Sequence, residues 1–377
     1  MSPRLSTLAL VVLAIDFGNA AQDKRPPVEV AFVANAEEAS IAMVDVAARA
    51  LIGSISVNFA EVESEGPGAP NYAQDTDVSP DGRILYVSRG YLGDVAAFDI
   101  ASGRPLWTRP LNTMRADHMT LTKDGRELFV SAFVDNRVYR LLAETGDITG
   151  RFAGGVFPHD VKVSRDGRRL FNTSLGRIPS FPIPAGMTPA ETPSIPVQLT
   201  IADAATLEVR DRIPMDTAMR PWQFNKDETG IYAQLSNQHA VVFYDVPARK
   251  ITRRLELPVK PGATVKDWDF DAPHHGLALT EDGTTLCLAG RASDYAALVR
   301  APELTLIATV PVGDGPGWSE TAQEGKVCLV ANSRSDDLSI ISIAERREIV
   351  RMPIGNGPKH ITVARIPASI ADAVKAR

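Results

Sequence analysis

The sequence predicts an all-β fold, a seven-bladed β-propeller, from three observations. A turn built on Asp-Gly recurs at residues 81–82, 124–125, 166–167 and 282–283. The first three of these turns are 43 and 42 residues apart. Four short strand-like runs fill each interval, and no helical periodicity interrupts them. A period near 42 residues with four strands per period is typical of propeller blades.

The order of the strand-like runs predicts how the ring closes. Three runs open the chain, at residues 28–34, 40–46 and 51–57. Six complete units follow, starting near residues 73, 116, 158, 220, 274 and 317. The N-terminal runs lack a first strand, and residues 359–364 form a first strand without successors. We expect one C-terminal and three N-terminal strands to form the seventh blade, which removes the open edges.

Two long intervals between turns indicate loop insertions within one domain, residues 21–377. Residues 178–197 are rich in proline, and residues 258–273 carry an acidic and aromatic cluster. The alternation of Asp267, Asp269 and Asp271 could bind calcium through carboxylate oxygens. It lacks the glycine and the bidentate glutamate of a calcium loop, so a solvated acidic loop is the simpler interpretation. This loop leads into His274, where it could act as a lid.

The N-terminus and the net charge limit where the protein can be located and what it can bind. Arg4, an apolar run of eleven residues and small residues near 18–21 predict a signal peptide over residues 1–20. No later apolar segment is long enough for a membrane span, so we expect a periplasmic or secreted protein. A net charge of −6 and a pI near 5.6 argue against nucleic acid as a partner.

The two cysteines, Cys287 and Cys328, are too few for a disulfide framework. Each lies in a strand-like run just after a turn, in neighbouring repeats. Free cysteine packs as a small hydrophobe, so buried free thiols are the expected state.

The C-terminal repeat resembles that of YVTN-type and lactonase-like seven-bladed propellers. The resemblance rests on residues 338–343, on 348–353 and on Ile354-Gly355-Asn356-Gly357-Pro358. Residues 327–332 stand where that family has its tyrosine-valine-threonine-asparagine signature, which is degenerate here. The resemblance covers nearly the whole mature chain and implies the fold. It leaves function open, because the family includes lactone hydrolases, lyases, metal carriers and cofactor-binding domains of redox enzymes.

The histidines share one phase of the repeat. Five of the six lie at the entrance to a first strand, which lines the central channel of a propeller; His239 lies off this phase and is expected at the surface. A ligand-binding ring is therefore predicted at one mouth of the channel. A structural role, in which each histidine satisfies a buried turn, is the alternative. The predicted ring comprises Asp75, His118, His159, Arg220 with Trp222, His274 with His275, Trp318 and His360.

Three kinds of chemistry fit this ring. His118, His159, His275 and His360 could bind a divalent transition metal, zinc or copper, with Asp160 or Asp117 orienting the rings. Alternatively, His118, His159 and His275 act as general acid and base on an organic anion that Arg220 binds. Trp222 and Trp318 would supply apolar walls in either case. The third possibility is binding without chemistry.

The sequence thus supports two functions of different classes. The first is binding of a small molecule, with hydrolase, lyase or isomerase activity left open. The second is a non-enzymatic scaffold that carries a metal or holds a protein partner. No glycine-rich phosphate loop, HExxH or GxSxG motif adds a stronger indication.

Overall fold

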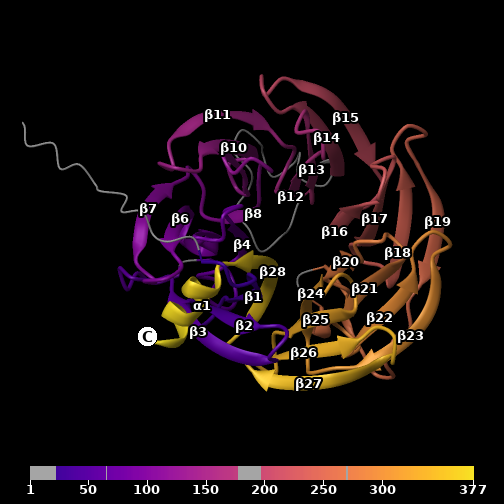
Figure 1. Cartoon of the computed structure of the whole chain (residues 1–377). Coiled ribbons are helices and arrows are strands. Elements are labelled where there is room, and N and C mark those ends of the chain that lie inside the picture. Colours follow the sequence, from indigo (N-terminus) through magenta and orange to yellow (C-terminus); the bar gives the residue numbers. More distant parts are fainter. Residues whose placement is uncertain (1–22, 65, 177–196, 269–270) are drawn as a thin grey trace, which may run out of the picture.

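Seven four-stranded antiparallel sheets surround a common axis in the described part of the computed structural model, residues 23–64, 66–176, 197–268 and 271–377 (Figure 1). This arrangement confirms the predicted seven-bladed propeller. Each blade is named here by its innermost strand. The innermost strands lie nearest the axis, and the fourth strand of each blade lies at the outside of the ring.

The strands follow the predicted order around the ring. The β4 blade comprises β4 (Asp75–Val78), β5 (Ile84–Ser88), β6 (Asp94–Asp99) and β7 (Pro105–Pro110). The β8 blade comprises β8 (Ala116–Leu121), β9 (Glu127–Ala132), β10 (Arg137–Leu142) and β11 (Ile148–Ala153). The β12 blade comprises β12 (Pro158–Val163), β13 (Arg169–Ser174), β14 (Val197–Asp203) and β15 (Val209–Met215).

The second half of the ring repeats the pattern. The β16 blade comprises β16 (Met219–Phe224), β17 (Gly230–Leu235), β18 (Ala240–Asp245) and β19 (Lys250–Glu256). The β20 blade comprises β20 (Leu277–Leu279), β21 (Thr285–Gly290), β22 (Tyr295–Arg300) and β23 (Thr305–Pro311). The β24 blade comprises β24 (Pro316–Ala322), β25 (Val327–Asn332), β26 (Asp337–Ser342) and β27 (Arg347–Pro353).

The ring closes as the sequence predicted. The last blade joins β28 (Pro358–Ile366) to β1 (Val28–Asn35), β2 (Ser40–Asp45) and β3 (Ala50–Ser56). β1 and β28 are antiparallel neighbours, with Val30 opposite Ala364 and Phe32 opposite Thr362. Because β1 pairs with β28, its backbone N–H and C=O groups do not form an open sheet edge.

The recurring Asp-Gly turn owes its sequence to two local requirements. Gly82 has a φ of +69°, a conformation that glycine adopts without steric cost. The Asp81 Oδ1 atom accepts hydrogen bonds from the Ser79 hydroxyl at 2.6 Å and from the Arg83 backbone N–H at 3.2 Å. The turns at Asp124, Asp166 and Asp282 repeat this pattern with Ser or Thr two residues earlier. The repeat is therefore a turn signature.

Packing between blades explains why the middle strands have continuous apolar runs. Every residue of β2, β17 and β25 is buried, because neighbouring blades cover both faces of each sheet. In contrast, six of the seven residues of the outer strand β19 are exposed. The core therefore forms a series of layers between adjacent blades, such as the cluster around Phe32 and Phe98.

Cys287 and Cys328 form a disulfide, so the expectation of buried free thiols is wrong. The bond joins β21 to β25 in neighbouring blades, with Cα atoms 6.3 Å apart, a distance that a disulfide spans. The sequence could not show this, because the two strands face each other only after the blades have packed. A structural disulfide fits an oxidising compartment.

A short C-terminal helix, α1 (Ala368–Lys375), was not predicted. Its Ile370, Ala371 and Val374 side chains are buried, and the helix packs beside β3 (Figure 1). Eight residues give only about two helical turns, too few for a clear periodic signal. None of the helices in the described ranges has the length and apolar character that a membrane span requires.

One predicted feature and most of another lie outside the described residues. The predicted signal peptide lies within residues 1–22, which are not described. The same holds for residues 177–196, most of the predicted proline-rich loop, whereas Val197 already belongs to β14.

Removing the closing strand should destabilise the whole ring. A chain that ends at Gly357 loses β28, and the exposed β1 edge should cause aggregation. A chain that ends at Ile366 keeps β28 and loses α1 alone, so it should remain monomeric with a modestly lower Tm. Size-exclusion chromatography and thermal unfolding measure both outcomes. Equal behaviour of the two truncated chains would contradict the closing role of β28.

Candidate metal centre

Bulges in the innermost strands aim the candidate side chains. The pairing of β8 with β9 shifts register between Ala116 and Met119, and β12 with β13 shifts between Pro158 and Val161. β16 and β24 carry similar shifts at the same end of the strand. Such bulges redirect side chains and often lie near functional sites. They surround His118, His159, Arg220 and Gly317.

The carboxylate of Asp75 lies between imidazoles from the two blades beside its own. Asp75 Oδ2 lies 3.0 Å from His118 Nδ1, and Asp75 Oδ1 lies 2.9 Å from His360 Nδ1. The backbone N–H of Met119 also donates to Oδ2, at 3.0 Å. Because a carboxylate accepts hydrogen bonds, the neutral form of His118 carries its proton on Nδ1 and its lone pair on Nε2.

His118, His159 and His275 converge beside this carboxylate. One nitrogen of each ring lies within 4.8 Å of the others, and all three side chains are buried. The ring centres of His118 and His159 are 4.5 Å apart, and those of His159 and His275 are 5.8 Å apart. His275 Nδ1 lies 3.0 Å from the Gly317 carbonyl oxygen, which favours the tautomer with the Nε2 lone pair.

A glycine makes the position of His275 possible. Gly276 has a φ of +150°, and a Cβ atom there would lie 2.6 Å from the backbone nitrogen of Ser319. β24 of the next blade therefore approaches closely enough for its Gly317 carbonyl group to reach His275. The Gly276 N–H donates to Gln234 Oε1 at 2.9 Å, which fixes this segment from the other side.

Trp318 fills the space among the imidazoles. The centre of its ring lies 4.1 Å from that of His360, 5.2 Å from His118 and 5.7 Å from His275. The indole of Trp318 is itself buried. It therefore restricts the movement of three imidazoles and excludes water from one side of the cluster.

Burial and neighbouring charges set the protonation of the cluster. Burial alone would raise the pKa of Asp75, but His360 and His118 outweigh it and hold this pKa well below its usual range. Burial opposes a charge on His118, yet the hydrogen bond and charge of Asp75 raise the pKa of His118. Burial, followed by the charge of His118, lowers the pKa of His159 well below its ordinary value. His159 is therefore neutral near pH 7.

Two predicted ring residues lie elsewhere. His274 is buried, and its Nε2 lies 3.1 Å from His239 Nδ1. His239 was expected at the surface, but it is partly buried between His274 and Trp268. Trp222 packs in the core against Phe224, with ring centres 5.0 Å apart. The structure does not bring His274 or Trp222 to His118.

Arg220 and Asp160 are buried near the cluster. The Arg220 guanidinium pairs with the carboxylate of Asp271 from the loop 258–273. Asp160 Oδ1 lies 3.5 Å from Lys162 Nζ, and Asp160 Oδ2 has no hydrogen-bond partner. In the same loop, Asp267 accepts a hydrogen bond from the Thr264 N–H at 2.7 Å and caps a turn. Asp269 lies outside the described residues.

A second level of side chains, which the sequence did not single out, follows two or three residues after the first level along six of the innermost strands. These six residues are partly exposed, whereas the imidazoles of the first level are buried. The signal was present in the sequence, because five of the six precede the acidic turn residue of their repeat by four positions. The second level comprises Asp77, Thr120, Lys162, Gln223, Glu320 and Thr362, and the matching position of β20 is Ala278, which is buried.

The comparisons with known proteins support the fold. No protein-family model matches the chain, and no curated protein matches it. Among solved structures, a chain of hydrazine synthase from Kuenenia stuttgartiensis is similar, with a TM-score of 0.64 and 16% sequence identity. The match covers 87% of this chain and 99% of that chain. At this identity, the likeness shows the propeller fold alone.

Glu320 should make the protein less stable as the pH rises. Burial raises the pKa of Glu320 from 4.5 to about 7, so ionisation costs more in the folded state. Stability is therefore lost between about pH 4.5 and 7. Glu320→Gln should therefore have a higher free energy of unfolding than the parent, and this gain should be larger at pH 8 than at pH 5. We expect the gain to differ by about 1 kcal/mol between the two pH values. This figure is reduced because Glu320 is partly exposed.

Urea unfolding at the two pH values measures this difference. Glu303→Gln, at an exposed position of the β20 blade, is the matched control and should show no such gain. A gain for Glu320→Gln that is equal at both pH values would contradict the explanation.

Proposed function

We propose that the protein binds one divalent transition metal ion, zinc or copper, on the propeller axis through His118, His159 and His275. The observation that carries this proposal is the approach of three buried imidazole nitrogens to within 4.8 Å of one another. Imidazole suits both metals. Tetrahedral coordination at about 2.05 Å places nitrogen ligands about 3.4 Å apart, so small ring rotations complete the site.

Buried polar atoms without partners support this proposal. His118 Nε2 and His159 Nδ1 have no hydrogen-bond partner, although both are buried. The same holds for Asp117 Oδ2 and Asp160 Oδ2 nearby. A buried polar atom without a partner costs free energy, so this concentration favours a bound cation.

The orientation of the rings favours this set of ligands over a second one. Asp75, His118 and His360 also lie within 4.8 Å of one another. However, both Asp75 oxygens already face an imidazole Nδ1 and accept backbone hydrogen bonds. In the preferred set, Asp75 and the Gly317 carbonyl group instead hold the Nδ1 atoms of His118 and His275. Such outer partners typically orient histidine ligands of metals.

The ion would bind a small molecule at a coordination position left by the three imidazoles. An ion held in this way can polarise a bound group or supply bound hydroxide. Hydrolase, lyase or isomerase chemistry is compatible with such a site. Burial of the ligands favours a resident ion over a carried one. Large exposed apolar residues are scattered over the outer strands of several blades, as Leu51, Leu106 and Ile251 are, which favours a small ligand over a protein partner.

We also propose that the protein is exported and that it belongs to the YVTN-type and lactonase-like propellers. The disulfide fits an oxidising compartment, and the N-terminal apolar run fits a signal peptide. The repeat near 42 residues and the closed seven-bladed ring fit the family resemblance.

Removing one ligand should abolish metal binding. Protein purified without chelator should carry one equivalent of metal, and His159→Ala should carry none. Elemental analysis measures the metal, and chelation should lower the Tm of the parent but not of the variant. His239→Ala, outside the cluster, is the matched control and should keep its metal. A parent protein that takes up no zinc or copper would overturn the proposal.

Asp75→Asn should weaken metal binding without removing a ligand. The amide offers one acceptor oxygen where the carboxylate has two, so the hydrogen bond with His118 Nδ1 is weakened and His118 loses its fixed orientation. We expect an affinity about 10- to 100-fold lower in competition with a chelator, together with a changed Co²⁺ absorption spectrum. Asp77→Asn, two residues along the same strand, should leave both measurements unchanged. An unaltered spectrum in Asp75→Asn would show that Asp75 does not position the ligand.

A further inference from the structure

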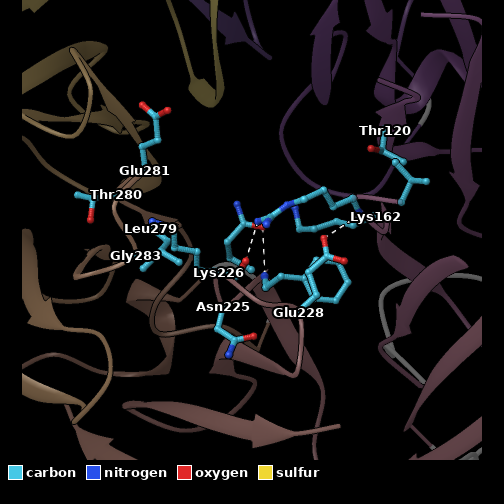
Figure 2. A pocket seen from close by; sticks show the side chains of 13 residues that line it. Thr120, Lys162, Asn225, Lys226, Glu228, Leu279, Thr280, Glu281 and Gly283 are labelled. Carbon is cyan, nitrogen blue, oxygen red and sulfur yellow. Dashed lines mark hydrogen bonds between the residues drawn. The ribbon is translucent and has the colours of Figure 1, made fainter. Parts of the chain in front are cut away.

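The end of the axis opposite the imidazoles contains a pocket that the proposed metal centre does not use. Its volume is about 420 Å³, within the range of pockets that hold small organic ligands. It lies at the turns between the first and second strands of the β12, β16 and β20 blades, and Thr120 reaches it from the β8 blade. Figure 2 shows Thr120 and Lys162 on one side of this pocket, across from Leu279, Thr280 and Glu281.

The pocket and the second level of axial side chains share residues. Thr120, Lys162 and Gln223 belong to both. Thr120 follows His118 by two residues, which places the two levels about 7 Å apart along the strand. The pocket is thus a solvent-accessible space beneath the buried cluster, lined by residues of four blades.

Lys162 is the charged group of this level that lines the pocket. Its ammonium group lies 5.4 Å from the centre of the Trp222 ring and 3.5 Å from Asp160 Oδ1, beyond a normal hydrogen bond. The side chain of Lys162 is 25% exposed, so solvent and small solutes reach it. The Trp222 ring and Asp160 thus flank this cation at the inner wall of the pocket.

The carboxylates of the second level do not contribute to the lining. Asp77 accepts backbone hydrogen bonds from Leu121 at 2.8 Å and from Val78 at 2.9 Å. Glu320 accepts one from Thr321 at 2.8 Å. Neither residue lines the pocket.

The remaining charges of the lining are Arg165 and Lys226 against Glu228 and Glu281. Glu228 is already bound, because its Oε1 accepts the Arg165 N–H at 2.8 Å. Side-chain donors line the inner wall, namely Lys162, Gln223 and Thr120. A positive inner wall with amide and hydroxyl groups has the chemistry that recognises a carboxylate.

We propose that this pocket is a binding site for a small organic anion, a carboxylate, which Lys162 recognises with Thr120 and Gln223. The site goes beyond the metal centre proposed above, and its test involves no metal. Its position suits a ligand that approaches the axis from the Asp-Gly end.

Cysteine labelling tests the charge preference of the pocket. Thr120→Cys and Gln223→Cys each place a thiol in its wall, whereas the native cysteines are joined as a disulfide. The rates of modification by an anionic and a cationic methanethiosulfonate of similar size are compared. Ser102→Cys, at an exposed position, gives the reference ratio. We expect the anionic reagent to be favoured about tenfold over the reference, and Lys162→Met to abolish this preference.

Protection by malonate, a small dicarboxylate, tests binding. Malonate should slow labelling at Thr120→Cys and Gln223→Cys when Lys162 is present, and have no effect in Lys162→Met or at Ser102→Cys. Near-UV circular dichroism establishes that each variant is folded, and the two positions check one another. A preference for the cationic reagent, a ratio equal to the reference, no labelling of either cysteine, or no protection by malonate would overturn the proposal.

Discussion

The pairing of β1 with β28 is the interaction on which the rest of the molecule depends. It converts a row of seven sheets into a ring, and the ring is what gives the innermost strands a common axis. His360 lies on β28, and its imidazole meets Asp75 and Trp318 from the two blades on either side. A cluster that draws on several blades exists only when all of them are in place, so the candidate centre and the fold form together.

The fold could be predicted because its signals are local. Each Asp-Gly turn encodes its own geometry through a glycine with positive φ and an aspartate that accepts nearby hydrogen bonds. The period then counts the blades. The disulfide between Cys287 and Cys328 could not be predicted in the same way, since it depends on how neighbouring blades align. Helix α1 was missed because it is short and is held mainly by packing beside β3.

The sequence predicted where along the innermost strands the candidate centre lies. It was harder to predict which side chains form it. A strand alternates its side chains between two faces, so one extra residue in a bulge reverses which of them faces the axis. The sequence could not decide between His274 and His275, and it placed Trp222 on the ring, although this residue packs in the core. In the structure, His275 joins His118, whereas His274 turns to His239. The same uncertainty concealed Lys162, which lies one level further along.

The disulfide also bears on how the ring could come apart. The junction between β28 and β1 is held by hydrogen bonds and packing, so fraying would begin there and move into the β24 blade beside it. The second strand of that blade, β25, is covalently tied to β21 of the following blade. A ring that peels open from β28 therefore meets a covalent stop two blades away. Reduction of the disulfide would remove this stop and let the two blades separate from each other.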